Sequence, residues 1–296
     1  MSAEQLISAR PAPKAPRNYG SSFIYDEPGP RGRRNIRIGS VVSAVVLAVL
    51  VGLALLQFAS HGQLDADHWV PFTQWPIWEY LLVGLRGTLE AAAIVAVLSA
   101  TFGVFLALGR LSAARPIRWM CTAYIEIART VPVLLMIYLM LFGLPQLGIN
   151  FPTLWKLAIP LTIANSAVFA EIVRAGIASL PRGQGEAALS LGMRRWQVMR
   201  WVVLPQALRN VAPSFVSQLV SLLKDTSLGF IVAFTEILYR GQVLASYLHL
   251  LIPTYLVVTL IYLVVNGSLS ALASRMQRST RRPMPKQANL PGIPAI

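Results

Sequence analysis

The sequence of 296 residues has little charge, one cysteine and three histidines. Charged residues make up 13% of the chain, against roughly 25% in a soluble domain, while 55% of residues are hydrophobic. Such a chain belongs in lipid. Because Cys121 has no second cysteine, an intramolecular disulfide is excluded, and no Cys/His cluster has the spacing of a metal site. The sequence therefore predicts no metal, no cofactor and no redox chemistry.

Acidic residues are also scarce: 12 Asp and Glu stand against 26 Lys and Arg, for a net charge of +14. A nucleic-acid-binding protein gathers its basic residues on a folded polar surface, but here they punctuate long apolar runs, which favours a bilayer over nucleic acid. The four lysines include none that follows a glycine. A phosphate-binding loop that ends in Gly-Lys-Ser/Thr is therefore missing, and the chain has no nucleotide site of that kind.

Long apolar runs are present instead. About 20 mostly apolar residues are needed to cross the hydrocarbon core as a helix. Six stretches satisfy this requirement, and the sequence predicts an all-α membrane protein with six transmembrane helices. The expected spans are residues 38–60, 78–109, 117–143, 154–178, 211–235 and 247–274.

The orientation of the spans follows from the basic residues, because positively charged loops stay on the cytoplasmic side. Seven Lys or Arg residues precede residue 38, three lie at 110–118, six at 174–209 and five at 275–286. The intervening segments 61–77, 144–152 and 236–246 contain only Arg240. Both termini are therefore predicted to be cytoplasmic. Residues 1–37, rich in Pro, Gly and Arg, and the last segment 281–296 are expected to be disordered or to lie on the membrane surface.

A polar, basic loop between the fourth and fifth spans, GQGEAALSLGMRRWQVMRWVVLPQALR at 183–209, is the most informative stretch. Residues 184–191 favour a helix, which Gly192 can end by adopting a positive φ. A second short helix is expected to follow, with Trp196 and Met199 on one face and arginines on another. Pro205 is expected to stop that helix, so that the fifth span begins in a new direction. From spacing alone, the loop could equally be an ordinary interfacial hairpin.

The pattern Glu186-Ala187-Ala188, Gly192 and Leu204-Pro205 resembles the EAA loop of ATP-binding-cassette import permeases. Several further segments resemble the permeases for polar amino acids: GQGEAA, LPQALR and SLLKDTSL within 182–228, EIARTVPVLL at Glu126 and AEIVRAGIASLPRG at Ala170. The tail segment YDEPGPRGRRN at Tyr25 resembles that of bacterial glutamate-uptake permeases. Thr130 departs from the family, in which many members have Gly before the Thr-Pro pair. The resemblance covers roughly residues 80–274.

The resemblance implies a type I importer permease, with a five-helix core and one additional N-terminal helix. Its expected parts are a tail at 1–37, the extra helix at 38–60, the permease domain at 78–274 with a coupling loop at 182–205, and a tail at 275–296. In this family the EAA loop docks on an ATPase subunit and transmits its closure, which assigns ATPase coupling to Glu186, Ala187, Ala188, Gly192 and Pro205. The implied partners are ATPase subunits, a second permease subunit, identical or different, and an extracytoplasmic solute-binding protein; ATP would be hydrolysed by another chain.

Charges inside the expected spans need partners or a cavity. Arg86 with Glu90, Glu126 with Arg129, and Glu171 with Arg174 are spaced to pair on one helix face. Lys224, Asp225 and Thr226 interrupt the fifth span, which is expected to bend or unwind there. Asn165 and Ser166 on the fourth span could hydrogen-bond a solute or a neighbouring helix. The candidate substrate pathway comprises Asn165, Ser166, Glu171, Lys224, Asp225 and Thr226.

Two other functions compete with an ATP-driven importer of a polar amino acid such as glutamate. An ion-gradient-driven secondary carrier for amino acids would be expected to show inverted repeats, and the six spans show no clear one. A membrane enzyme would need a convergent set of catalytic groups. His61, His68 and His249 lie in or near outward segments without a matching carboxylate cluster, so the sequence favours transport over catalysis.

Overall fold

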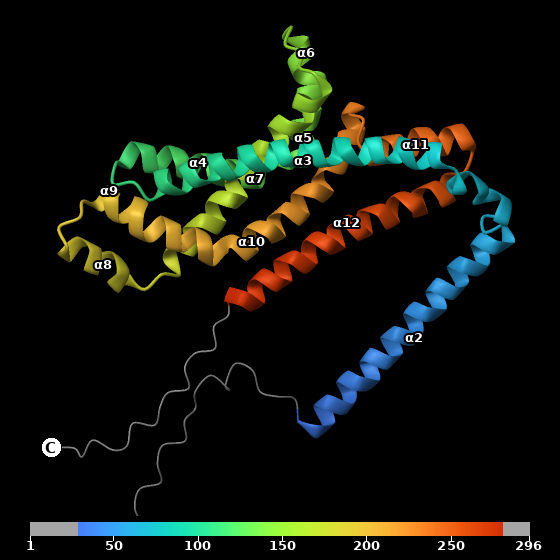
Figure 1. Ribbon diagram of the computed structural model, residues 1–296, viewed down its shortest axis with the longest axis horizontal. Coiled ribbons are helices and arrows are strands. Elements are labelled where there is room, and N and C mark those ends of the chain that lie inside the picture. Colours follow the sequence, from blue (N-terminus) through green and yellow to red (C-terminus); the bar gives the residue numbers. More distant parts are fainter. Residues whose placement is uncertain (1–28, 281–296) are drawn as a thin grey trace, which may run out of the picture. The chain divides into compact units, whose positions relative to one another are not determined.

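The computed structural model describes residues 29–280, and nearly all of them are helical (Figure 1). The chain divides into two compact units at Leu64. In the first unit, helix α2 spans Pro30–Ser60. Its start shows that residues 30–37 are not part of an irregular tail, because Pro30 stands at the first helical position, where its fixed φ favours a helix. The expected disorder of residues 1–28 and 281–296 lies outside the described residues.

The second unit contains the remaining elements. Short 3-10 helices at Ala66–His68 and Val70–Thr73 precede α3 (Trp75–Arg110), α4 (Arg115–Thr130) and α5 (Val133–Tyr138), and a π-helical turn at Leu139–Gly143 leads into α6 (Leu144–Gln146). Then follow α7 (Thr153–Ala178), α8 (Arg182–Ser190), α9 (Arg195–Gln197), the π-helical η4 (Val198–Val203) and α10 (Leu204–Asp225). The 3-10 helix η5 (Thr226–Val232), α11 (Ile237–Leu248) and α12 (Leu251–Thr280) complete the unit.

Helices α3 and α7 form the centre of this unit, and α7 crosses α3 in Figure 1. The α3 face that is buried carries small residues at intervals of four, namely Ser99, Gly103 and Ala107. An added Cβ at Gly103 would come within 2.6 Å of the Phe169 Cβ of α7. Small residues allow helix backbones to approach closely in membranes, where lipid tails remove the hydrophobic drive for association.

Within residues 29–280, five helices are long and apolar enough to cross a membrane, namely Arg31–Ser60, Trp75–Arg110, Thr153–Ala178, Arg195–Val232 and Leu251–Met276. The expected span at 117–143 is instead a broken pair, Arg115–Thr130 and Val133–Gln146, bent by 93°. Pro132 lies at the break: its ring disfavours helical geometry at Val131, which is extended with ψ of 123°. The structure therefore has six spans only if this pair counts as one.

The start of the fifth span differs from its prediction, because Pro205 does not stop the preceding helix. Residues 195–232 form one continuous helical segment. The π-helical turn of η4 precedes Pro205, which stands in the first turn of α10. A proline is accepted there because the π-helical turn before it changes the hydrogen-bond pattern, so that the N–H which proline lacks is not required. The interruption expected near Lys224–Thr226 is present, since α10 ends at Asp225 and tightens into η5.

A buried glutamate fixes the segment between η5 and α11. The Glu236 carboxylate accepts hydrogen bonds from the backbone N–H groups of Leu238 and Tyr239, at 2.8 and 2.7 Å, and from the Tyr262 hydroxyl at 3.0 Å. The Ile237 N–H donates to Thr88 Oγ1 of α3 at 3.1 Å. Burial raises the pKa of Glu236 above its ordinary value, and these hydrogen bonds oppose the rise. The carboxylate thereby caps α11 and joins it to α12, while the Ile237–Thr88 hydrogen bond joins the start of α11 to α3.

Candidate functional site

The polar loop at 182–205 folds into a hairpin of α8 followed by α9 and η4. Helix α8 ends in a Schellman motif: the Gly192 N–H donates to Leu189 O at 2.9 Å and the Met193 N–H to Ala188 O at 3.4 Å. Gly192 has a φ of +79°, as the sequence predicted. A Cβ at this position would meet nothing within 4 Å, so the backbone conformation alone calls for glycine. The turn thus determines the direction in which the chain leaves α8 and returns towards the bundle.

The hairpin has an outer and an inner face. Glu186, Ala187 and Leu191 are exposed, and Leu191 is 84% exposed. Ala188 differs from the expectation that it belongs to a docking surface, because only 5% of it is exposed. Helix α8 lies against η4, in which Val198 is also buried. Alanine at 188 lets the two segments approach, while its neighbours Glu186 and Ala187 face outward.

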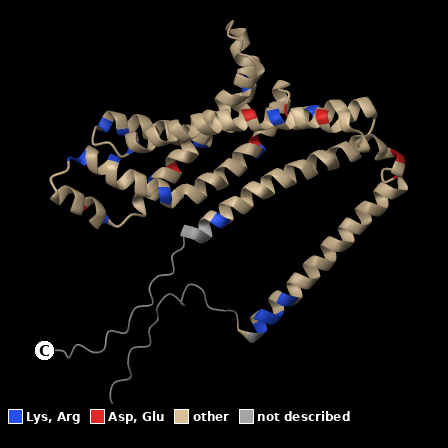
Figure 2. Ribbon diagram, in the orientation of Figure 1, with Lys and Arg blue, Asp and Glu red and all other residues tan. Residues whose placement is uncertain are grey.

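The hairpin is joined to the membrane helices through the first turns of α10. The Gln206 amide donates to Val202 O at 2.8 Å and reaches Gln184 Oε1 of α8 at 3.5 Å. Because η4 continues into α10 without a break, the second arm of the hairpin and α10 belong to one helical segment. Figure 2 shows Lys and Arg gathered where α8, α9 and the α3–α4 loop lie.

A cavity of about 330 Å³ lies between α4, α7 and α10. It is lined by Ala128, Arg129, Val131, Pro132, Val133, Ala164, Asn165, Val168, Gln218 and Asp225. Across it, the Gln218 amide donates to Asn165 Oδ1 at 2.8 Å, while the Asn165 amide donates to Leu161 O at 2.9 Å. The cavity therefore contains one cationic side chain, one anionic side chain and two amides.

The structure brings together only two of the six predicted pathway residues, Asn165 and Asp225. Ser166 is buried and makes a 3.1 Å hydrogen bond with the Tyr124 hydroxyl, so it joins α7 to α4. The Thr226 hydroxyl, at the start of η5, donates to Leu223 O at the end of α10, at 2.7 Å. Lys224 is exposed. The hydroxyl groups of Ser166 and Thr226 are thus used in structural hydrogen bonds.

Glu171 belongs to a cluster of charges that joins three helices. It pairs with Arg110 at the end of α3 and with Arg174 one turn along α7, the latter at 2.8 Å. Arg110 also contacts Glu126 of α4 at 3.2 Å. The predicted Arg86–Glu90 and Glu171–Arg174 pairs are confirmed, the first at 2.6 Å. The predicted Glu126–Arg129 pair is wrong, because Glu126 contacts Arg110 from another helix.

Sequence reasoning missed Arg129 and Gln218 as cavity residues. Arg129 was assigned to Glu126 by its spacing of three, but no ion pair of Arg129 occurs among residues 29–280. Helix α4 ends one residue beyond Arg129, where the chain turns at Pro132, and this places Arg129 beside the cavity. Gln218 could have been predicted from the sequence, since it is an amide side chain inside an expected span, as is Asn165, which was among the candidates.

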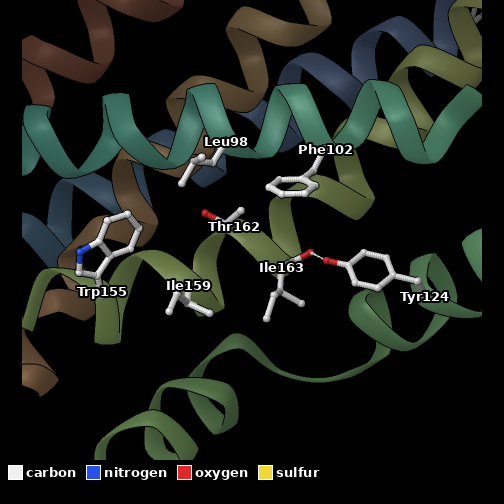
Figure 3. Close-up of a pocket in the computed structure, with 7 residues that line it drawn as sticks. All are labelled: Leu98, Phe102, Tyr124, Trp155, Ile159, Thr162 and Ile163. Carbon is white, nitrogen blue, oxygen red and sulfur yellow. Dashed lines mark hydrogen bonds between the residues drawn. The ribbon is translucent and has the colours of Figure 1, made fainter. Parts of the chain in front are cut away.

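A second cavity, of about 250 Å³, has a different chemical character (Figure 3). Leu98 and Phe102 of α3 face Trp155, Ile159 and Ile163 of α7 across it, and Tyr124 lies at one end. No charged side chain is among its described lining residues. A charged solute would lose its hydration there without compensation, so this cavity is unsuited to polar cargo.

Comparison with known proteins identifies the family. The chain is 41% identical over 230 residues to the glutamate transport system permease protein GluD of Corynebacterium glutamicum, covering 75% of this chain and 83% of that protein. It is 34% identical to the glutamate/aspartate import permease protein GltK of Escherichia coli, over 69% of this chain and 95% of that protein.

A solved amino acid ABC transporter, crystallised with histidines, superposes with a TM-score of 0.66 at 31% identity, over 73% of this chain and 99% of that one. The model of one protein family matches residues 99–282, which contain the hairpin, the charge cluster and both cavities apart from Leu98. The chain therefore belongs to the family of binding-protein-dependent transport system inner membrane components.

Proposed function

We propose that this chain is the permease subunit of an ATP-driven importer that carries a polar amino acid of the glutamate type into the cytoplasm. Support comes from the family and from its relatives, which include glutamate and glutamate/aspartate permeases. The proposed location is the cytoplasmic membrane, with both termini on the cytoplasmic side, as the distribution of basic residues predicts.

The cavity between α4, α7 and α10 is the proposed path of the solute, and its pair of opposite charges is the observation on which this proposal rests. The α-carboxylate of an amino acid needs a cationic donor and its ammonium group needs an acceptor. Arg129 and Asp225 supply these two groups, while Asn165 and Gln218 supply neutral hydrogen-bonding groups. A guanidinium group suits a carboxylate because its N–H groups match both oxygens.

ATPase coupling is assigned to the hairpin. In this proposal the exposed Glu186 and Ala187 contact an ATPase subunit, and Ala188 and Gly192 maintain the shape of the hairpin. Pro205 lies where η4 enters α10, so a displacement of α8 would move α10 and with it Gln218 and Asp225. The complete importer would contain two permease subunits, identical or different, two ATPases and an extracytoplasmic solute-binding protein.

The test is uptake of radiolabelled glutamate into proteoliposomes that contain the full importer and enclosed ATP, after proton and sodium gradients have been collapsed. Uptake should persist without the gradients. Arg129→Gln should lower uptake at limiting substrate about 10- to 150-fold, because a hydrogen bond to a charged group contributes about 1.5–3 kcal/mol.

Arg86→Gln is the matched control, since it also removes an arginine from a membrane helix, but one with an 80% exposed side chain and a local partner in Glu90. It should leave uptake within about twofold of the original protein. Uptake that disappears with the gradients would support the secondary carrier instead. Equal uptake by Arg129→Gln and the control would remove the cavity from the solute path without touching the role of the hairpin.

A further inference from the structure

A third cavity opens between the end of α3 and the base of the coupling hairpin. It has a volume of about 710 Å³, within the range of small-molecule sites. One wall consists of apolar side chains of α3, including Phe105 and Leu108. The opposite wall carries Trp196 and Met199 between two arginines, Arg195 and Arg200. The groove is thus apolar along α3 and cationic along α9 and η4.

The two arginines of this groove have no acidic partner in the part of the chain that the structure describes. Of the described lining residues none is acidic, and neither Arg195 nor Arg200 makes an ion pair within residues 29–280. The guanidinium carbon of Arg200 lies 5.2 Å from the centroid of the Trp201 ring, and this contact provides no carboxylate for the guanidinium N–H groups. The positive charge is therefore available to an anionic ligand from outside the chain.

The surroundings indicate that the ligand comes from the bilayer. Phe105 is 66% exposed on a helix that is long and apolar enough to span the membrane, and Leu111, directly after that helix, is 43% exposed. Trp196 and Trp201 are exposed beside the arginines, and tryptophan is enriched where the hydrocarbon meets the headgroup layer. The apolar wall of α3 can contact an acyl chain, and the arginines of the opposite wall, with exposed tryptophans beside them, can contact a phosphate, so the groove offers partners for both parts of a phospholipid.

We propose that this groove binds an anionic phospholipid, with its phosphate between Arg195 and Arg200 and an acyl chain along Phe105 and Leu108. The proposal does not depend on the transported solute. Its consequence is mechanical: the lipid would bridge α3 to the segment that joins the coupling hairpin to α10. An anionic lipid would then hold the base of the hairpin against the bundle.

The test uses the purified full chain in detergent, stripped of native lipid and titrated with phosphatidylglycerol or phosphatidylcholine of identical acyl chains. Native mass spectrometry gives the occupancy of each lipid. Basic residues at an anionic surface contribute about 1 kcal/mol each, so two arginines should favour phosphatidylglycerol about 30-fold. Arg195→Gln/Arg200→Gln should abolish this preference.

Arg209→Gln/Arg275→Gln is the matched control, because it removes the same charge from exposed positions that do not line the groove. It should keep the preference within about twofold. Leu108→Trp, which narrows the groove at its apolar wall, should weaken binding of both lipids without changing the ratio of their affinities. Unchanged melting midpoints would show that each variant is folded.

Three results would overturn the proposal. Equal loss of preference in the control would assign the effect to overall charge. Displacement of phosphatidylglycerol by millimolar inorganic phosphate would indicate a site for free anions. Loss of a dimeric species in Arg195→Gln/Arg200→Gln, with lipid occupancy unchanged, would identify the groove as a contact between two copies of the chain.

Discussion

At the scale of single residues, Gly192 is the position of the hairpin where the backbone conformation most restricts the choice of residue. Its φ of +79° costs about 1–2 kcal/mol for a residue with a Cβ, and β-branched residues tolerate it least. We predict that Gly192→Val lowers ATP-dependent uptake at least tenfold because α8 is turned away from the ATPase. Gly192→Asn should keep more than half of the uptake, since Asn adopts this conformation readily. The measurement is uptake per inserted permease.

The open space around Gly192 makes this pair of variants informative. No atom lies within 4 Å of an added Cβ, so a difference between Val and Asn reports backbone conformation and not a steric clash. Equal uptake by both variants would show that the turn geometry has no part in coupling.

Residue-level predictions succeeded where the backbone itself dictates the residue, and failed where a partner came from another helix. Gly192 followed from turn chemistry. The position of Arg129 could not be predicted in this way, because its spacing to Glu126 suits a local pair. Glu126 instead pairs with Arg110, which lies 16 residues away. A single sequence gives the neighbours along one helix face but not which other helix approaches that face.

At the scale of helices, the contact between α3 and α7 depends on Gly103. A Cβ there would lie 2.6 Å from Phe169 Cβ and 3.0 Å from the Ala170 backbone N, so the helices would have to separate. Overpacking of this kind costs about 1–3 kcal/mol. We predict that Gly103→Ala lowers the melting midpoint of the purified chain by several degrees, as followed by circular dichroism.

Gly267 in α12 provides the control, because an added Cβ there meets nothing within 4 Å. Gly267→Ala should keep or raise the melting midpoint, since alanine favours a helix interior by up to about 1 kcal/mol over glycine. A midpoint for Gly103→Ala as high as that of Gly267→Ala would mean that the two helices do not approach closely at this position.

The two prolines near element ends explain why the helix boundaries were harder to predict than the helices themselves. Pro132 breaks its span by 93°, whereas Pro205 sits in a continuous helical segment. Both lack the N–H that a helix interior requires. At Pro205 a π-helical turn absorbs the missing hydrogen bond, and at Pro132 the extended Val131 does not continue the helix. The outcome depends on packing around each proline, which a sequence pattern does not contain.

At the scale of the whole molecule, hydropathy and charge together determined most of the architecture. The all-α fold follows from the apolar runs, because lipid leaves backbone groups no partner except those within a helix. The polar cavity could not be located in the same way. It depends on α4, α7 and α10 meeting at Arg129, Asn165, Gln218 and Asp225, which lie up to 96 positions apart in the sequence.

The positive-inside pattern makes a prediction that the helices alone do not, since it assigns a side of the membrane to each loop. Cys121→Ser removes the single native thiol. In that background, two separate variants each introduce one exposed thiol on a side of the membrane that the pattern predicts: Leu191→Cys on the hairpin, on the cytoplasmic side, and Asp65→Cys before α3, on the outer side. A membrane-impermeant maleimide added to intact cells stripped of any outer barrier should label Asp65→Cys and spare Leu191→Cys, and inside-out vesicles should reverse the pattern. Labelling of Leu191→Cys from the outside would put the hairpin out of reach of a cytoplasmic ATPase, and ATP-driven coupling through α8 would then be impossible.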